Sequence, residues 1–134
     1  NYLNMNLAKQ KLYLNPSVYI GKSKRHRWGV FAEQDIKQFD VIQESPYCTF
    51  AQEEIEEDGE LIRYCYESSD SMRTDEMIIG FGFAALFNHS CDDSNAAYDL
   101  DTVNEVMRHF ATEDIAAGSE ILINYGYDDD EFDD

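Results

Sequence analysis

The sequence predicts one compact domain built mainly of β-strands. Its 134 residues suit a single domain, and 43% hydrophobic and 13% aromatic residues are enough for a buried core. Short apolar runs recur along the chain, with turn-forming residues between them at short intervals. This pattern is typical of a mainly β fold. No run of eighteen apolar residues occurs, so we expect no membrane-spanning segment.

The first half of the chain is expected to hold four short strands. Residues 1–15 come before them and are expected to form a short amphipathic helix or an arm. Residues 22–27, the only concentrated basic segment, form the loop between the first two strands, and the breaker Pro46 divides the other two. The expected strands are Val18–Gly21, Trp28–Ala32, Val41–Glu44 and Tyr47–Phe50.

The second half begins with a segment that we interpret as a variable insertion, residues 53–76. It is acidic at first and then apolar, and we expect a helical turn or two in it. Met77–Phe87 is apolar, but Gly80 and Gly82 argue against a regular long helix. The last seven residues, 128–134, include six acids and are expected to form a solvated end. Further strands are expected at residues 96–100, 105–111 and 120–125.

The two halves share a short internal sequence similarity, which we call the internal echo. Residues 34–42 resemble residues 113–121, and each segment has the pattern of a strand end, a turn and a new strand. One echo does not indicate a repeat protein.

The charge of the chain limits the classes of partner that it is expected to bind. The formal net charge is −18 and the pI is about 4.2. A domain this acidic repels nucleic acid phosphates, so we expect no direct binding to DNA or RNA. It attracts basic partners such as lysine-rich peptides. The alternative is that the acidity only keeps the protein soluble; a site that requires a cationic substrate would decide against it.

The cysteines indicate a reducing, intracellular setting. There are three of them, Cys48, Cys65 and Cys91, and no Cys-x-x-Cys pair. An odd count without such pairs argues against a disulfide scaffold. It also argues against a structural zinc site, which needs about four ligands.

Three segments carry the motifs that indicate a function. They are Ser23–Ala32, then Asn88-His89-Ser90-Cys91 with Asn95 after it, and Glu120–Asp128. In this order and spacing they resemble the SET-domain protein lysine methyltransferases, and the resemblance runs from about Val18 to Tyr127. The small size is most similar to the minimal SET domains of viral proteins, which have no flanking cysteine-rich modules.

The resemblance implies a fold. It is the SET-domain, β-clip-like arrangement of several small curved sheets, with residues 18–127 as its core in a single domain of residues 1–134. In this family the C-terminal segment is threaded under the loop that carries the Asn-His-Ser motif and so forms a pseudoknot. Threaded loops are rare, so sequence patterns alone would not predict one.

The resemblance also implies a reaction, the transfer of a methyl group from S-adenosylmethionine to a lysine ε-amine of a basic protein. A histone-like tail is the substrate that it suggests. The attacking amine must be neutral, although a free lysine has a pKa of about 10.4. Desolvation in an aromatic tunnel and a nearby sulfonium cation lower the pKa of an amine. Tyrosine hydroxyls at the end of such a tunnel orient the amine, and proximity then contributes to the rate.

Residue roles follow from the resemblance. Tyr125 is implied as the catalytic tyrosine beside the transferring methyl group. Taken alone, His89 is more often a hydrogen-bonded core histidine and Asn88 a turn cap, and Tyr98 and Tyr64 are as often core residues. The residues implied in binding S-adenosylmethionine are Arg27, Trp28, Asn88, His89, Tyr125 and Phe132, and those implied in the substrate-lysine channel are Tyr98, Tyr127 and Tyr64.

The sequence departs from the family pattern at two glycine positions. Arg27 stands where the first motif usually has its first glycine, and Phe39 stands in a later turn that usually carries one. Only glycine takes positive φ cheaply, so both turns are in question. Arg27 has an alternative role in reaching the carboxylate of the cofactor. Cys91 resembles a cysteine that joins a zinc cluster in larger members, but no further cysteines follow it, so we expect an ordinary thiol and no metal.

Two other functions stay open. Arg27 favours a catalytically inactive SET-like module that binds peptides, and the charge favours an acidic decoy for a basic protein. The decoy leaves the motifs unexplained. The enzyme is expected in the cytoplasm or a host nucleus, and its oligomeric state, including a homodimer, stays open.

Overall fold

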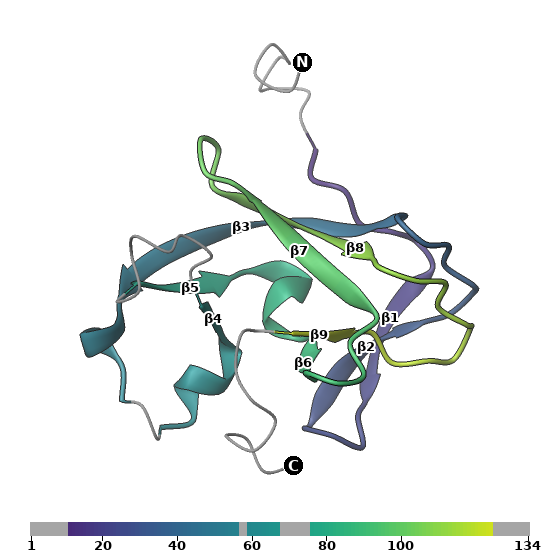
Figure 1. The fold of residues 1–134 in the computed structure, drawn as a ribbon, viewed down its shortest axis with the longest axis horizontal. Coiled ribbons are helices and arrows are strands. Elements are labelled where there is room, and N and C mark those ends of the chain that lie inside the picture. Colours follow the sequence, from purple (N-terminus) through teal and green to yellow (C-terminus); the bar gives the residue numbers. More distant parts are fainter. Residues whose placement is uncertain (1–10, 57–58, 68–75, 125–134) are drawn as a thin grey trace.

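The structure is a computed structural model that describes residues 11–56, 59–67 and 76–124. Strands dominate the described part, and its helical elements are the short 3-10 turns η3 (Gln52–Glu54), η4 (Leu61–Tyr64) and η5 (Gly82–Ala85). The prediction of a mainly β fold is therefore confirmed (Figure 1). The strands are β1 (Val18–Lys22), β2 (Trp28–Ala32), β3 (Val41–Ala51), β4 (Cys65–Glu67), β5 (Glu76–Gly80), β6 (Asn88–His89), β7 (Ala96–Asp101), β8 (Val106–Ala111) and β9 (Leu122–Ile123).

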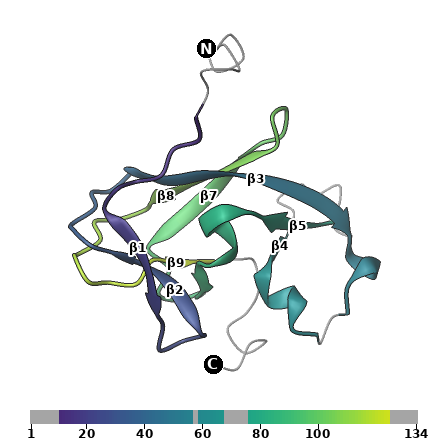
Figure 2. The same ribbon diagram turned by 180° about the vertical axis from the view of Figure 1, so that it is seen from behind.

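The described strands form two curled sheets, which lie side by side in Figures 1 and 2. β1 and β2 form an antiparallel hairpin, from Val18 opposite Ala32 to Lys22 opposite Trp28. The basic loop closes it, because the Ser23 amide donates to the Arg27 carbonyl at 3.0 Å. The other sheet has the strand order β4-β5-β3-β8-β7-β9-β6.

The predicted break at Pro46 is wrong, because β3 runs without interruption for 11 residues. Pro46 lies at the point where the strand changes partners. Residues up to Pro46 pair with β8, and residues from Tyr47 onward pair with β5. Proline lacks an N–H, and its carbonyl is still used, since it accepts from the Phe81 amide at 3.0 Å. A proline is tolerated where one ladder ends and another begins.

The described part of the N-terminal segment forms an arm along β3 and not a helix. Leu14 bridges to Gln43, and the Asn15 amide donates to the Ile42 carbonyl at 2.8 Å. The Glu44 amide donates to the Tyr13 carbonyl at 2.7 Å. Of the two predicted alternatives for residues 1–15, the arm is therefore the one seen in residues 11–15, and residues 1–10 lie outside the described residues.

The C-terminal segment passes between two strands that are joined by a loop. β9 pairs in parallel with β6, with Asn88 opposite Leu122, and also in parallel with β7, where Ala96 is opposite Ile123. Residues 90–95 connect β6 to β7, so this loop crosses β9. This is the threaded arrangement that the family resemblance implied.

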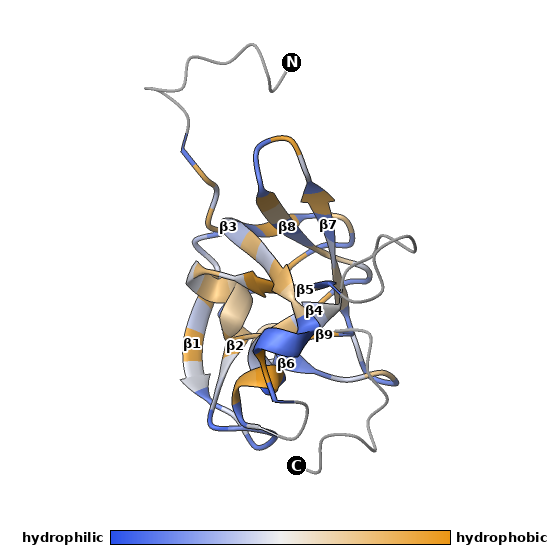
Figure 3. Ribbon diagram, turned by 90° about the vertical axis from the view of Figure 1, so that its left-hand side faces the viewer, coloured by the Kyte–Doolittle hydropathy of each residue, from blue (hydrophilic) through white to orange (hydrophobic). Residues whose placement is uncertain are grey.

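The core is formed by alternating inward residues of the strands. Figure 3 shows bands of apolar and polar residues along β1 and β3, but burial does not follow hydropathy in these two strands, since Ile20 of β1 is exposed and Gln43 and Ser45 of β3 are buried. β2 buries Val30 and Ala32, and β8 buries Met107 and Ala111, all with no exposed surface. The segment interpreted as an insertion also reaches the core, because Cys65 and Tyr66 of β4 are fully buried.

The internal echo has a structural counterpart that extends slightly further, to residues 30–42 and residues 109–121. We call these the first and the second turn segment. Phe31 bridges to Glu120, and Phe110 pairs with Val41 at the equivalent place. In the middle, Ile36 and Ile115 exchange backbone hydrogen bonds of 2.8 and 2.7 Å. The two turn segments therefore pair with each other about an approximate two-fold axis.

The two turns repeat the same hydrogen bonds. The Phe39 amide donates to the Ala111 carbonyl at 2.8 Å, and the Gly118 amide donates to the Ala32 carbonyl at 2.7 Å. Phe39 has φ of 72° and Gly118 has φ of 88°. Phe39 therefore adopts the left-handed conformation that the glycine expected there would take.

Candidate functional site

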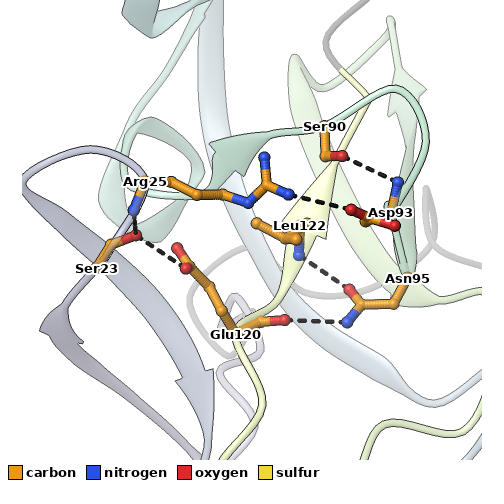
Figure 4. A network of polar contacts seen from close by, with 7 residues as sticks. All are labelled: Ser23, Arg25, Ser90, Asp93, Asn95, Glu120 and Leu122. Carbon is orange, nitrogen blue, oxygen red and sulfur yellow. Dashed lines mark hydrogen bonds and ion pairs between the residues drawn. The ribbon is translucent and has the colours of Figure 1, made fainter. Parts of the chain in front are cut away.

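The three motif segments meet at one place, where Glu120 connects them. Its Oε1 accepts a hydrogen bond from the Ser23 hydroxyl at 2.8 Å, and its Oε2 accepts one from Asn88 Nδ2 at 2.7 Å. Its carbonyl accepts from Asn95 Nδ2 at 3.0 Å, and Asn95 Oδ1 accepts from the Leu122 amide at 2.9 Å (Figure 4). The predicted motif segments are thus held together by side-chain hydrogen bonds.

A second set of contacts holds the basic loop against the loop after β6. Arg25 pairs with Asp93 at 3.2 Å, and the Asp93 amide donates to the Ser90 hydroxyl at 2.9 Å. The Arg25 amide donates to Ser23 Oγ at 2.9 Å. Figure 4 shows these contacts beside those of Glu120. They join the loop after β1 to the loop over β9.

Gly29 is required at its position by close packing and not by its backbone angles. A Cβ atom at Gly29 would overlap the Glu120 carboxylate and lie 3.0 Å from Asn88 Nδ2. Asn88 Nδ2 also lies 3.2 Å from the Trp28 carbonyl. The second glycine of the motif therefore leaves space for the contact between Asn88 and Glu120.

A pocket of about 120 Å³ lies next to this junction. It brings together four residues that the resemblance implied: Arg27 and Trp28 for the cofactor, Asn88 for the cofactor, and Tyr64 for the lysine channel. The remaining wall consists of His26, Arg63, Ala85, Leu86 and Phe87. Residues from the basic loop, the insertion and the segment before β6 thus face one cavity.

The rim of the pocket carries three side chains with nitrogen donors around Glu60, and two of them are arginines. His26 Nε2 lies 3.5 Å and an Arg27 terminal nitrogen 3.9 Å from Glu60 Oε1. Arg63 Nε lies 3.9 Å from Glu60 Oε2. In a chain with a net charge of −18, this is an unusual concentration of positive charge.

Arg27 takes the backbone conformation of the glycine that it replaces. Its φ is 47°, in the left-handed region. The loop keeps the shape in which the Ser23 amide reaches the Arg27 carbonyl. The arginine therefore places its side chain at the rim of the pocket from a turn with a left-handed backbone.

His89 and Cys91 lie together on the other side of β6 from the pocket. His89 is not among the residues that line the cavity. Its Nε2 lies 3.4 Å from Cys91 Sγ, and its backbone pairs with Ile123. Successive side chains of a strand point to opposite faces, which explains why Asn88 faces the junction with Glu120 and His89 does not.

A buried polar chain lies behind the pocket wall. The imidazole of His109 is fully buried, and Phe87 stacks on it with ring centroids 4.5 Å apart. Gln43 Nε2 lies 2.7 Å from Nδ1 of His109, so that nitrogen must accept, and Nε2–H then donates to Tyr66 Oη at 2.9 Å. The Tyr66 hydroxyl donates to the Ala84 carbonyl at 2.8 Å. Burial lowers the pKa of His109 to about 3, so the ring is neutral at pH 7.

Tyr98 packs on this buried chain and is not among the residues that line the pocket. Its ring meets that of Tyr66 edge-on at 4.7 Å and lies 5.9 Å from that of His109. Its place in the lysine channel stays a prediction. Tyr125, Tyr127 and Phe132 also stay predictions, because they lie outside the described residues.

Sequence reasoning assigned no role to several residues of the site. Glu120 and Asn95 lie inside the quoted motif segments, so their polar side chains beside apolar strand residues were the available signal. Glu60 and Arg63 had no such signal, because only the fold brings the insertion to the basic loop.

The cysteine thiols and the metal-ligating side chains of the described residues add little to the site. Burial, and then the nearby Cys48, raise the pKa of Cys65 to about 11, which makes it an unreactive thiol. Within residues 11–56, 59–67 and 76–124, no group of three or more His, Cys, Asp or Glu side chains is arranged to hold a metal ion. Over the same ranges, no helix is both long and apolar enough to cross a membrane.

Comparisons with known proteins concern the fold and the family of the chain. Over 110 residues the chain is 28% identical to the histone-lysine N-methyltransferase of Schizosaccharomyces pombe that is specific for lysine 37 of histone H3, covering 80% of this chain and 71% of that protein. The crystal structure of a candidate histone methyltransferase of Plasmodium falciparum matches with a TM-score of 0.64 and 32% identity, covering 85% of this chain and 96% of that one.

The methyltransferase domain of human PR domain-containing protein 2 matches with a TM-score of 0.63 and 19% identity, covering 87% of this chain and 81% of that one. At this identity the likeness concerns the fold alone. The family model described as the SET domain matches residues 27–126, which include the second motif segment whole and most of the first and third. The chain therefore belongs to the SET domain family.

Proposed function

We propose that this SET domain is a lysine methyltransferase that uses S-adenosylmethionine and acts on a basic, histone-like protein. The observation that carries the proposal is the pocket at which Arg27, Trp28, Tyr64 and Asn88 meet. The names of the Schizosaccharomyces pombe and Plasmodium falciparum relatives, which both state histone methylation, support the reaction class.

The residues of the pocket fit S-adenosylmethionine. When bound, this cofactor supplies an electrophilic methyl group on a sulfonium. Its other parts are an adenosine and an amino-acid end with a carboxylate. Trp28, Leu86 and Phe87 offer apolar and aromatic surface, while Arg27 and Arg63 offer cationic groups. The Nε2 atom of His26 is buried and has no hydrogen-bond partner among the described residues, as expected for a group that awaits a ligand.

The side chains of this domain would prepare the lysine. We assign Tyr125 as the catalytic tyrosine, which orients the amine with its hydroxyl, and Phe132 as the residue that packs on the adenine. Tyr64, Tyr98 and Tyr127 would form the channel, exclude water and so favour the neutral amine. The proton of the lysine then leaves to solvent before the amine reacts. Arg27, Trp28, Asn88 and His89 are assigned to the cofactor.

The charge of the domain supports a basic substrate. A net charge of −18 attracts lysine-rich segments over long range and speeds their encounter with the enzyme. The conformation of Arg27 supports the enzyme over an inactive module, because the arginine keeps φ of 47° and with it the loop of the glycine.

The test is transfer of a radiolabelled methyl group from S-adenosylmethionine to a panel of basic proteins, with mass spectrometry of the labelled lysine. We expect incorporation into a histone-like protein, and a loss of about 100-fold or more in Tyr125→Phe. Tyr13→Phe is the matched control, since Tyr13 lies on the arm along β3 and should keep the parent rate. If the folded protein transferred no labelled methyl group, the result would count against the enzyme. An unchanged rate of transfer in Tyr125→Phe would contradict the catalytic role of Tyr125.

A further inference from the structure

The buried polar chain behind the pocket wall joins strands that are not neighbours in the sheet. Its members Gln43, Tyr66 and His109 lie on β3, β4 and β8, and each is no more than 2% exposed. In the strand order, β5 and β3 separate β4 from β8, yet the Tyr66 hydroxyl lies 2.9 Å from Nε2 of His109. The chain therefore links the strand of the insertion to the middle of the sheet.

One side of this chain supports the wall of the pocket. Phe87, a lining residue, stacks on the His109 ring with centroids 4.5 Å apart and 27° between the ring planes. The Tyr66 hydroxyl donates at 2.8 Å to the carbonyl of Ala84, directly before residues 85–87, which line the pocket. His109 and Tyr66 thus hold the segment that forms this wall, each at a different point.

The same two rings support Tyr98, which the proposed function assigns to the lysine channel. Tyr98 is opposite His109 in the ladder between β7 and β8, and its ring lies 5.9 Å from the imidazole. The Tyr66 ring meets the Tyr98 ring edge-on at 4.7 Å. Because aromatic rings at such distances prefer particular orientations, His109 and Tyr66 restrict where the Tyr98 ring can lie.

Stability alone does not require a polar chain at this place. The equivalent residue of the first turn segment is Val30, which is also buried with no exposed surface. Replacing both partners of a buried hydrogen bond by apolar groups is often nearly neutral for stability. A fully paired polar chain adds a fixed geometry, because each buried polar group is destabilising unless its partner stays in place.

We propose that His109 and Tyr66 are positioning residues that fix the wall of the donor pocket relative to the lysine channel. Both are fully buried, so they act through Phe87 on the donor side and Tyr98 on the acceptor side. This inference rests on the proposed function. Methyl transfer requires the amine and the methyl group to be aligned, and a displacement of about 1 Å can lower a rate by about 100-fold.

Tyr66→Phe tests the chain with the smallest chemical change, since it removes the hydroxyl and keeps the ring beside Tyr98. The substrate is the basic protein that the parent labels best. With both substrates saturating, we expect kcat per folded molecule to fall by about tenfold, because the alignment of the two ligands becomes less exact. The KM for the protein and the dissociation constant of S-adenosylhomocysteine, measured by calorimetry, should change by less than about threefold.

A double variant tests whether the two residues act as one unit. Tyr66→Phe and His109→Val each break the hydrogen bond between them. The kcat of the double variant should therefore lie within about twofold of that of the slower single variant, whereas independent effects would multiply. His109→Gln should lose less activity than His109→Val, because its amide can still donate toward the Tyr66 hydroxyl.

Tyr47→Phe is the matched control. It makes the same chemical change at another buried tyrosine, on β3, which belongs neither to the polar chain nor to the pocket wall. It should keep the kcat of the parent. Thermal melts of every variant set the assay temperature well below unfolding, so that a loss of stability is not counted as a loss of rate.

The outcomes separate this inference from the proposed function. If the parent transfers methyl groups and Tyr66→Phe keeps its kcat while only its melting temperature falls, the positioning role is overturned and the enzyme stands. A loss confined to KM or to the affinity for S-adenosylhomocysteine would also overturn it, because the chain would then shape one site only. If the folded parent labels no protein, the proposed function fails and this inference fails with it.

Discussion

The first turn segment, residues 30–42, and the second, residues 109–121, have the same backbone arrangement but different tasks. Where they carry the same residue, the two copies are buried to a similar degree. The buried pairs are Ala32 with Ala111, Ile36 with Ile115, and Ile42 with Ile121; Phe31 with Phe110 is half-buried in both copies, and Asp35 with Asp114 is exposed in both. Three differences have consequences for the molecule, namely Val30 against His109, Phe39 against Gly118, and Val41 against Glu120.

The residues that the two turn segments share build the fold, and the residues that differ adapt the second segment to the site. Val41 pairs with Phe110 and has an apolar side chain, whereas the carboxylate of Glu120 at the equivalent place binds Ser23 and Asn88. Val30 is a buried apolar residue, whereas His109 carries the buried polar chain behind the pocket wall. The second turn segment is thus the one that faces the functional site.

Truncation of the isoleucines that the two turn segments share should lower the stability most. Ile36 and Ile115 are each 2% exposed and face each other, so Ile36→Ala and Ile115→Ala should each lower the free energy of unfolding by about 2–5 kcal/mol. Chemical denaturation measures both. Ile20→Ala is the control, because Ile20 is 42% exposed and should cost much less. A small effect of one variant and a large effect of the other would contradict the symmetric packing.

His109→Val introduces the residue that the first turn segment carries at the equivalent place, Val30. It tests, through the pH dependence of stability, whether His109 is neutral in the folded protein. Its folded pKa, about 3, lies below the ordinary value of 6.5. As pH falls below 6.5 the unfolded state takes up a proton that the folded state does not. The parent should therefore lose up to about 1.4 kcal/mol of unfolding free energy per pH unit from this group, down to its folded pKa.

The measurement is denaturation at several pH values between 7.5 and 5, for the parent and for His109→Val. The 28 acidic residues contribute to the pH dependence of both proteins, so the difference between the two slopes isolates the histidine. His109→Val should also be less stable at pH 7, since Gln43 and Tyr66 lose a partner. Identical slopes would mean that His109 is not held neutral in the folded state.

Gly118→Ala isolates the backbone of the second turn. Gly118 has φ of 88°, and a Cβ atom added there meets nothing within 4 Å. The expected loss of about 1–2 kcal/mol therefore comes from the left-handed conformation and not from a clash. Thermal denaturation checks it. If the alanine variant were as stable as the parent, this turn would not require glycine.

Phe39→Gly makes the opposite change in the first turn, with the smallest effect. The side chain of Phe39 is 71% exposed, so little packing is lost, and glycine relieves the cost of φ at 72°. Glycine also gains freedom in the unfolded chain, so the net gain should be at most about 1 kcal/mol. A parallel melt of parent and variant measures it. A loss of stability would indicate that the phenyl ring makes a contribution that its exposure does not suggest.

Much of the fold follows from local patterns. The alternating residues of Trp28–Ala32 and the basic loop before them predict β2 at its observed bounds and β1 to within one residue. Pro46 misled the prediction of β3, because propensity describes one ladder and cannot show that a strand changes partners at that residue. The positive φ of Phe39 accompanies a hydrogen bond from its amide to the distant Ala111 carbonyl, which sequence patterns do not show.

By itself, the sequence determined the mainly β character, the family motifs and the acidic charge, because periodicity, spacing and composition are local properties. The tertiary structure decided which residues share the pocket. Glu60 of the insertion pairs with Arg27, and Arg63 lines the same pocket as Arg27. Glu120 reaches Asn88 only because β9 lies between β6 and β7. Contacts between residues far apart in the chain depend on how the strands are ordered, and that order is set by the packing of the whole domain.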